Sequence, residues 1–181
     1  MTHLILKLLP MKKITKMVAF LAHSNLSLIR YPLIWLFNSI YEPNLNEARE
    51  KNLKDYSSLN DFFIRKIKEE SRTFDEDLLE IGSPVDGVIS SFGVIEEGRL
   101  IQAKGIDYSL KDLVASETEY KKFNNGYFLT IYLSPKDYHR IHSPSDGKVY
   151  LTEHIPGSLF SVNESSQRSV RDLYAINERS L

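Results

Sequence analysis

Two nearly identical turns constrain how this 181-residue chain folds. Residues 83–89 read Ser-Pro-Val-Asp-Gly-Val-Ile, and residues 143–149, which begin 60 positions later, read Ser-Pro-Ser-Asp-Gly-Lys-Val. In each segment the proline fixes the backbone that enters the turn, Asp-Gly suits a tight turn, and a β-branched residue follows. The pair therefore predicts two turns that each begin a strand, and for Asp146 we expect no role beyond its turn.

Beyond residue 80 the chain consists of short runs of β-branched and aromatic residues that are separated by Gly, Asp and Asn. Such runs favour strands, which we expect at residues 88–94, 100–103, 127–133 and 148–152. We expect a helical turn at residues 110–114. Because the region before residue 80 has helical periodicity instead, the sequence predicts an α+β fold, with N-terminal amphipathic helices followed by a mostly antiparallel β core.

Two apolar runs with helical spacing make up this N-terminal region. Over residues 4–21 the apolar positions recur every three to five residues, and Pro10 is expected to break the helix. The second run, residues 26–40, contains Trp35, and Pro32 suits the first turn of its helix. Neither run has the roughly 18 uninterrupted apolar residues that a membrane-spanning helix needs.

Charge is distributed unevenly between this region and the rest. Residues 1–41 contain five Lys or Arg and no acidic residue, although the whole chain has a formal net charge of −1. A basic, apolar segment favours an anionic membrane surface over nucleic acid. Packing on the chain's own core is the alternative, and a secretory signal lacks a convincing cleavage site after Ala22. We expect residues 1–57 to form a membrane-association segment and residues 58–181 a separate core.

A short helical pattern opens the second of these segments. Ser58 suits the position that caps a helix, and Asp61 in the first turn complements the helix dipole. Phe62 and Phe63 provide an apolar face, and Arg65 is expected to stay solvated on the other.

The stretch from Leu133 to Gly147 concentrates side chains that move protons near neutral pH. His139 and His142 stand three residues apart, among acids, an arginine and a tyrosine. The same spacing permits a shared metal ion, but the chain has no cysteine and no third ligand is evident, so we expect no metal site.

Asp86 in the first of the twin turns is a candidate partner for His142. An aspartate held by a rigid turn can accept the Nδ1 proton of a histidine, which leaves the other ring nitrogen to act as a base toward a nucleophile. Spacing along the chain does not establish that the two side chains meet, and each can equally be an ordinary turn or surface residue.

Six segments in the same order resemble the phosphatidylserine decarboxylases of the membrane-associated bacterial type. The most specific is the run Asp-Tyr-His-Arg-Ile-His-x-Pro, which begins at Asp137. The resemblance covers nearly the whole chain and rests on residues 58–65, 83–89, 102–105, 132–142, 156–163 and 173–179.

The resemblance implies a proenzyme of phospholipid biosynthesis that cuts itself and thereby makes its own pyruvoyl cofactor. In the family an aspartate, a histidine and a serine form a charge relay for this cleavage, and the first two roles fall on Asp86 and His142. The pyruvoyl carbonyl then reacts with the amine of phosphatidylserine and serves as an electron sink for loss of CO₂. His139 is implied as the proton donor that completes formation of phosphatidylethanolamine, supported by Asp137 and Tyr138. The family also implies a peripheral position on the cytoplasmic face of a bacterial membrane.

The sequence departs from the family at its C-terminal end. The family's Gly-Ser cleavage motif lies downstream of the segment that here ends near Leu181, and the pairs Gly82-Ser83 and Gly157-Ser158 match other family segments. We therefore expect these 181 residues alone to lack the serine that forms the pyruvoyl group, together with the C-terminal strands of the β core. We expect this polypeptide neither to cleave itself nor to decarboxylate phosphatidylserine.

Three interpretations follow from this departure. A separately encoded C-terminal small-subunit segment could complete the enzyme. The chain could instead be a non-catalytic lipid-binding or interaction remnant of it. A serine hydrolase that uses Asp86, His142 and Ser158 or Ser161 is disfavoured, because no Gly-x-Ser-x-Gly elbow is present.

Overall fold

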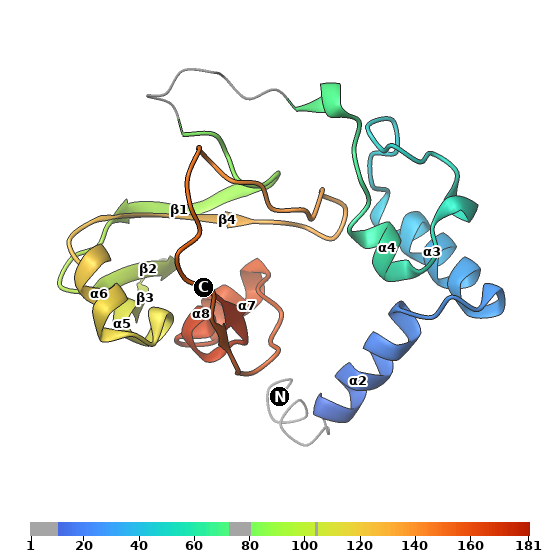
Figure 1. Cartoon of the computed structure of the whole chain (residues 1–181). Coiled ribbons are helices and arrows are strands. Elements are labelled where there is room, and N and C mark those ends of the chain that lie inside the picture. Colours follow the sequence, from blue (N-terminus) through green and yellow to red (C-terminus); the bar gives the residue numbers. More distant parts are fainter. Residues whose placement is uncertain (1–10, 73–80, 104) are drawn as a thin grey trace. The chain divides into compact units, whose positions relative to one another are not determined.

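The structure of this chain is a computed structural model that describes residues 11–72, 81–103 and 105–181 (Figure 1). Pro10 and the first part of the helix predicted over residues 4–21 lie outside these ranges. The chain divides into two compact units. The helical unit comprises the residues up to Gly87 together with residues 133–146, and the β unit comprises residues 88–132 and 147–181.

The helical unit contains α-helices in the regions predicted to be helical, together with two short 3-10 helices that the sequence did not predict. These are the helices α2 (Met11–Ala22), α3 (Ser27–Tyr41) and α4 (Leu59–Phe63) and the 3-10 helices η1 (Leu53–Asp55) and η2 (Glu69–Ser71). The helix predicted over residues 26–40 is confirmed. The expected place of Pro32 is wrong, because it lies inside α3 and not in its first turn. No helix in the described ranges has both the length and the apolar character needed to cross a bilayer.

A small aromatic core holds the helical unit together. Its buried members are Ile34 of α3, Phe62 of α4 and Tyr56, which lies in the loop before α4. The rings of Tyr56 and Phe62 meet edge to face with their centroids 4.9 Å apart, an arrangement that aromatic quadrupoles favour. This packing attaches α4 to α3.

The local signals that predict α4 are confirmed, with one exception. The Ser58 hydroxyl accepts a hydrogen bond from the amide of Asp61 at 3.0 Å, and Asp61 lies in the first turn. Phe62 is fully buried. Arg65 contradicts its prediction, because only 3% of its surface is exposed. Its guanidinium binds backbone carbonyls of a distant loop, which the local sequence does not reveal.

The β unit is built from three antiparallel pairs of strands. Strand β1 (Val88–Val94) pairs with β4 (Tyr127–Tyr132), β2 (Arg99–Ala103) with β3 (Ile106–Ser109), and β5 (His154–Ile155) with β6 (Arg179–Ser180). The strands predicted at residues 88–94, 100–103 and 127–133 are confirmed, and so is an α+β fold.

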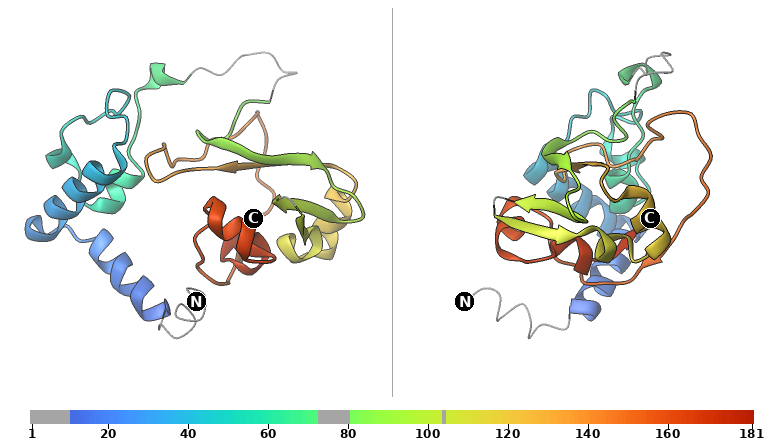
Figure 2. Two further views of the ribbon diagram at one scale, coloured as in Figure 1. Left: turned by 180° about the vertical axis from the view of Figure 1, so that it is seen from behind. Right: turned by 90° about the vertical axis from the view of Figure 1, so that its left-hand side faces the viewer.

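Short helices complete the β unit. Helix α5 (Leu110–Val114) confirms the predicted helical turn, and α6 (Glu117–Phe123), α7 (Glu164–Ser169) and α8 (Leu173–Ile176) follow. Both views in Figure 2 show these helices beside the β2–β3 pair. The unit has a separate apolar core, made of Ile95, Leu100, Tyr108, Leu110 and Val114.

The strand predicted at residues 148–152 is wrong. This stretch is irregular, and Val149 and Tyr150 are 77% and 68% exposed. A strand needs neighbouring backbone for its N–H and C=O groups, and strand pairing begins only at the next residue, where Glu153 and Leu181 exchange two backbone hydrogen bonds. The Tyr150 hydroxyl instead donates to the carboxylate of Glu119 at 2.7 Å.

A bulge in β2 joins the strands to the C-terminal helices. The register with β3 shifts between Ile101 and Ala103, which frees Gln102 from the ladder. Its buried side chain donates to the carbonyl of Val170 at 2.7 Å and accepts from the amide of Leu173 at 2.8 Å. Gln102 therefore anchors α8 through hydrogen bonds from its side chain to backbone groups.

We predict that Gly157→Ala destabilises the chain strongly. A Cβ at Gly157 would lie 2.5 Å from the backbone carbon of Asn177 and 2.6 Å from the backbone nitrogen of Glu178, which cannot yield as a flexible side chain can. We expect a loss of unfolding free energy of about 2 kcal/mol or more by denaturant titration. Gly147→Ala is the matched control, because its Cβ meets nothing within 4 Å. Equal stabilities of the two variants would contradict this packing.

Candidate active site

The twin turns recognised in the sequence pair with each other in the helical unit. The amide of Gly82 donates to the carbonyl of Pro144 at 2.8 Å, and the amide of His142 donates to the carbonyl of Pro84 at 2.8 Å. Gly82 and His142 are equivalent positions 60 residues apart, and so are Pro84 and Pro144. Exchanging the two segments therefore turns one hydrogen bond into the other, so the pairing has a local two-fold symmetry. This pairing brings the turn that carries Asp86 beside the irregular segment that carries His142.

The serines of the twin turns have matching structural roles. The hydroxyl of Ser83 donates to the carbonyl of Val85 at 2.7 Å, and that of Ser143 donates to the carbonyl of Ser145 at 2.6 Å. Each hydroxyl stabilises its own turn. Ser83, which follows Gly82, is therefore engaged in turn formation.

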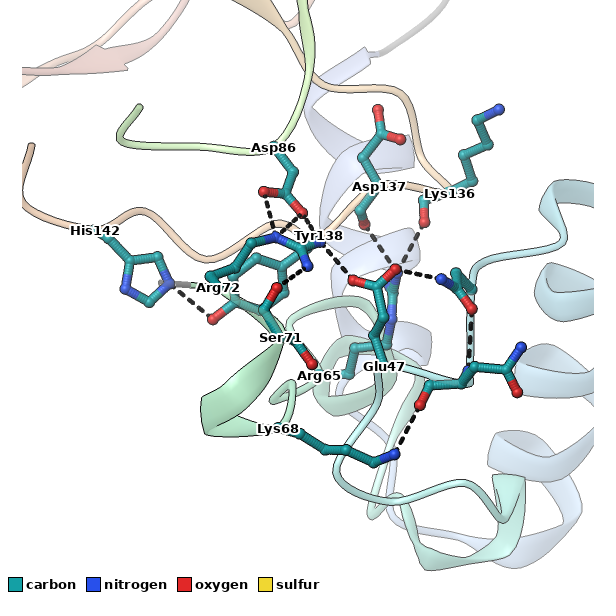
Figure 3. Close-up of polar contacts among 12 residues, drawn as sticks. Glu47, Arg65, Lys68, Ser71, Arg72, Asp86, Lys136, Asp137, Tyr138 and His142 are labelled. Carbon is teal, nitrogen blue, oxygen red and sulfur yellow. Dashed lines mark hydrogen bonds and ion pairs between the residues drawn. The ribbon is translucent and has the colours of Figure 1, made fainter. Parts of the chain in front are cut away.

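Asp86 is held by an arginine that the sequence analysis missed. Arg72 Nε lies 3.0 and 3.1 Å from the two carboxylate oxygens of Asp86, and Arg72 Nη2 also contacts this carboxylate. The same Nη2 forms an ion pair of 2.5 Å with Glu47. Figure 3 shows the guanidinium between the two acids. Hydrogen bonds to Asp86 raise the pKa of Arg72 above its ordinary value, so the guanidinium of Arg72 is charged throughout the physiological range.

His142 is oriented by Tyr138. The Tyr138 hydroxyl and His142 Nε2 are 2.9 Å apart, and the two rings stack with their centroids 5.5 Å apart (Figure 3). Burial raises the pKa of Tyr138, so its hydroxyl keeps its proton and can donate it to the imidazole. A neutral imidazole that accepts at Nε2 carries its hydrogen on Nδ1. This is the tautomer that a carboxylate acceptor such as Asp86 would require.

His139 has a different environment from His142. Its Nε2 lies 2.9 Å from the carbonyl oxygen of Ser134, and its ring stacks on Phe63 with the centroids 4.0 Å apart. A carbonyl only accepts, so Nε2 carries a hydrogen. Burial lowers the pKa of His139 and the charge of Arg65 lowers it further, against the opposing effects of the Ser134 carbonyl and Asp137. The neutral ring presents an unprotonated Nδ1, and donation from this ring requires prior protonation there.

Asp137 shapes the loop that carries both histidines. Its carboxylate accepts a hydrogen bond from the amide of Ser134 at 2.7 Å, and its own amide donates to the Ser134 carbonyl at 2.9 Å. The carbonyl of Ser134 thus serves both the backbone of Asp137 and the ring of His139. Asp137 acts on the loop, in keeping with a supporting role.

The sequence analysis missed Arg65, Arg72 and Glu47. Lone charged residues in polar stretches are most often solvated, and nothing in their spacing distinguishes these three from their neighbours. Only the resemblance of residues 58–65 to a known family indicated that Arg65 belongs to a special segment.

Comparison with known proteins gives a consistent result over most of the chain. The family model for phosphatidylserine decarboxylase matches residues 59–181. The chain is 47% identical over 172 residues to a phosphatidylserine decarboxylase proenzyme of Francisella tularensis subsp. novicida, covering 95% of this chain and 60% of that protein. It is 41% identical over 170 residues to the proenzyme of Psychrobacter arcticus, covering 94% and 61%. The chain thus spans about 60% of the length of these relatives.

We predict a measurable coupling between Arg72 and Asp86. In a double-mutant cycle of Arg72→Met and Asp86→Asn, we expect a coupling free energy of about 0.5–1 kcal/mol in urea unfolding, because both groups are partly exposed. High salt should reduce it. The matched control is the exposed Arg168–Glu164 pair of α7, for which we expect a smaller coupling. Equal coupling in the two pairs would contradict a structural role for the ion pair of Arg72 and Asp86.

Proposed function

This chain belongs to the phosphatidylserine decarboxylase family, and we propose that it supplies the large-subunit portion of such a proenzyme. The proposed reaction converts phosphatidylserine to phosphatidylethanolamine and CO₂ in phospholipid biosynthesis. The observation that carries the proposal is the backbone pairing of the twin turns, which places the segments of Asp86 and His142 side by side.

We propose that Asp86 and His142 serve self-cleavage, as the family resemblance implies. The bond from Tyr138 to Nε2 favours a hydrogen on Nδ1 of His142, which suits an aspartate acceptor. Arg72 holds the carboxylate of Asp86 in place by hydrogen bonds to both of its oxygens. An attacking serine hydroxyl would need Nε2, so it must take the position that the Tyr138 hydroxyl occupies here.

We propose that His139 handles the proton of decarboxylation. The pyruvoyl group, once formed, supplies the electron sink that stabilises the carbanion left by CO₂. The residues present fit such a group, because the half-buried ring of His139 stacks on Phe63 and directs an unprotonated Nδ1 away from the Ser134 bond. After protonation at Nδ1, His139 can return that proton to carbon.

The β unit offers a surface for the small-subunit segment that the family implies. In the β1–β4 pair, Phe92 lies opposite Leu129 and Val94 lies opposite Tyr127, so the four side chains form two cross-strand pairs. All four are exposed. Exposed apolar pairs on a two-stranded sheet favour a covering partner, and the relatives contain further sequence that could supply it. We propose a C-terminal small-subunit segment as that partner.

The helical unit offers a surface for lipid. Side chains that are large, apolar and exposed lie on α2, on α3 and between them; they include Met17, Val18, Phe20, Leu26, Leu28 and Trp35. The sequence up to residue 41 contains five Lys or Arg and no acidic residue, and an apolar surface in such a segment suits an anionic bilayer. We propose that residues 1–57 attach the protein peripherally to the cytoplasmic face of a bacterial membrane, where phosphatidylserine resides.

We predict that a polypeptide carrying the remaining C-terminal portion of the Francisella relative restores processing when it is co-expressed with this chain. Intact-mass measurement should reveal a pyruvoyl-terminated fragment, and labelled phosphatidylserine should release CO₂. Asp86→Asn and His142→Gln should each lower processing by about 10³-fold or more. The matched control is Asp146→Asn, the equivalent position of the second turn, which should process normally.

Two results would contradict this assignment. One is a pyruvoyl fragment from the 181-residue chain alone, and the other is unchanged processing in Asp86→Asn. Vesicle binding without any processing by the complemented pair would favour a non-catalytic lipid-binding remnant.

We predict that Trp35 reports membrane binding directly, because it is the single tryptophan and is 64% exposed. Its fluorescence should shift to shorter wavelength with anionic vesicles, and much less with zwitterionic ones. Phe20→Ser should weaken binding by about tenfold, given the lost apolar area. Leu159→Ser in the β unit is the control, and an equal loss there would argue against attachment through the helices.

A further inference from the structure

The end of α4 contacts the histidine loop through three consecutive residues, Phe63, Ile64 and Arg65, which we call the α4 platform. The ring of Phe63 stacks on that of His139. The carbonyl of Ile64 accepts a hydrogen bond from Arg140 Nε at 2.8 Å. Each platform residue thus contacts the loop by a different chemistry, and together they contact it on both sides of Tyr138.

Arg65 makes the deepest of these contacts. Its Nη2 donates to the carbonyl oxygens of Lys136 at 2.8 Å and Asp137 at 3.2 Å (Figure 3). Among the residues that the structure describes, its buried Nε and Nη1 have no hydrogen-bond partner. Burial lowers the pKa of Arg65, because the charged guanidinium loses its hydration when it is buried.

A buried guanidinium of this kind is poorly explained by stability alone. Replacing buried charges with apolar side chains is often neutral or stabilising, so burial of a cation is not by itself a source of stability. Phe62 already provides the buried apolar contact of α4. What Arg65 adds is one terminal nitrogen, Nη2, that donates to two successive carbonyls and is held there by a planar, rigid guanidinium.

The two carbonyls belong to the turn that sets the ring of His139. The carboxylate and amide of Asp137 close this turn on Ser134, and the Ser134 carbonyl in turn holds His139 Nε2. Movement of residues 136–137 would therefore displace the Ser134 carbonyl, and with it the hydrogen bond that holds the His139 ring. The groups around His139 are the Phe63 ring, the Arg65 cation, the Asp137 carboxylate and the Ser134 carbonyl.

We propose that Arg65 is a positioning residue for His139: it clamps the backbone of residues 136–137 and, with Phe63, fixes the imidazole so that Nδ1 faces the reacting carbon. The direction of Nδ1 toward substrate rests on the proposed function. The clamp itself rests only on the contacts of the helical unit and is testable without decarboxylation.

The test is an NMR titration of His139 in the 181-residue chain, comparing wild type, Arg65→Lys and Arg65→Met. Lysine keeps the charge, but its shorter and more flexible side chain lacks the planar guanidinium that holds Nη2 against both carbonyls, so the ring should gain solvent and its pKa should rise by about 0.5 or more toward the ordinary value. Methionine also removes the repelling charge, and the pKa should rise further. A role of Arg65 as charge alone predicts instead that Arg65→Lys matches wild type, which would overturn the clamp.

Two further variants sharpen the result. Phe63→Leu should likewise raise the His139 pKa by exposing the ring, while the exposed Arg49→Lys should leave it unchanged. In Arg65→Lys the ring signals of His142 should move less than those of His139, because Tyr138 still holds Nε2 of His142.

A wild-type measurement keeps the proposal falsifiable if Arg65→Lys unfolds, as judged by circular dichroism. The Nη hydrogens of Arg65 should exchange with water more slowly than those of Arg49, and their signals should shift as His139 titrates. Equally fast exchange, or no shift, would overturn the proposal. Because none of these readouts uses substrate, failure of the clamp and failure of the decarboxylase assignment remain distinguishable.

Discussion

The pairing of the twin turns is the interaction on which the candidate active site depends. Two backbone hydrogen bonds, from Gly82 to Pro144 and from His142 to Pro84, join segments 60 residues apart. Prolines set the direction of both segments, and each serine hydroxyl closes its own turn. The two backbone bonds are the backbone contacts between the two stretches, and residues 133–146 return to the helical unit only after 45 residues of the β unit.

Two arginines hold the site in opposite ways. Arg72 is partly exposed and bridges the carboxylates of Glu47 and Asp86, so it orients an acid at modest energetic cost. Arg65 is buried and binds carbonyls, so it orients backbone at a desolvation cost. One arginine thus serves the proposed maturation turn and the other the proposed decarboxylation histidine. The two histidines, which look equivalent in the sequence, thus have different surroundings.

Each unit also exposes apolar side chains that a small isolated protein would normally bury. On the helical unit these lie on α2 and α3 among basic residues, and on the β unit they form cross-strand pairs of β1 and β4. The chain spans about 60% of the length of its relatives, and the proposed lipid surface and small-subunit segment would cover these two faces separately. In that arrangement, attachment and catalytic completion are properties of different units.

The parts of this protein that depend on local chemistry could be predicted from its residues. The capping of α4 by Ser58, the helix over residues 26–40, three of the strands and the family were all readable, because short-range hydrogen bonds and apolar periodicity encode them. The strand at 148–152 was wrong, because strand formation requires a partner and not only β-branched residues.

The contacts that hold the candidate site became visible only in the folded chain. That Arg65 is buried, that Arg72 clamps Asp86 and that Tyr138 contacts Nε2 of His142 depend on segments brought together across 71, 14 and 4 positions of the chain. The contact between Tyr138 and His142 is short in sequence, yet its geometry depends on the twin-turn pairing that fixes the backbone of His142. A charged or hydroxyl side chain reads alike in sequence whether water or a carbonyl surrounds it, and only the folded neighbourhood makes the distinction.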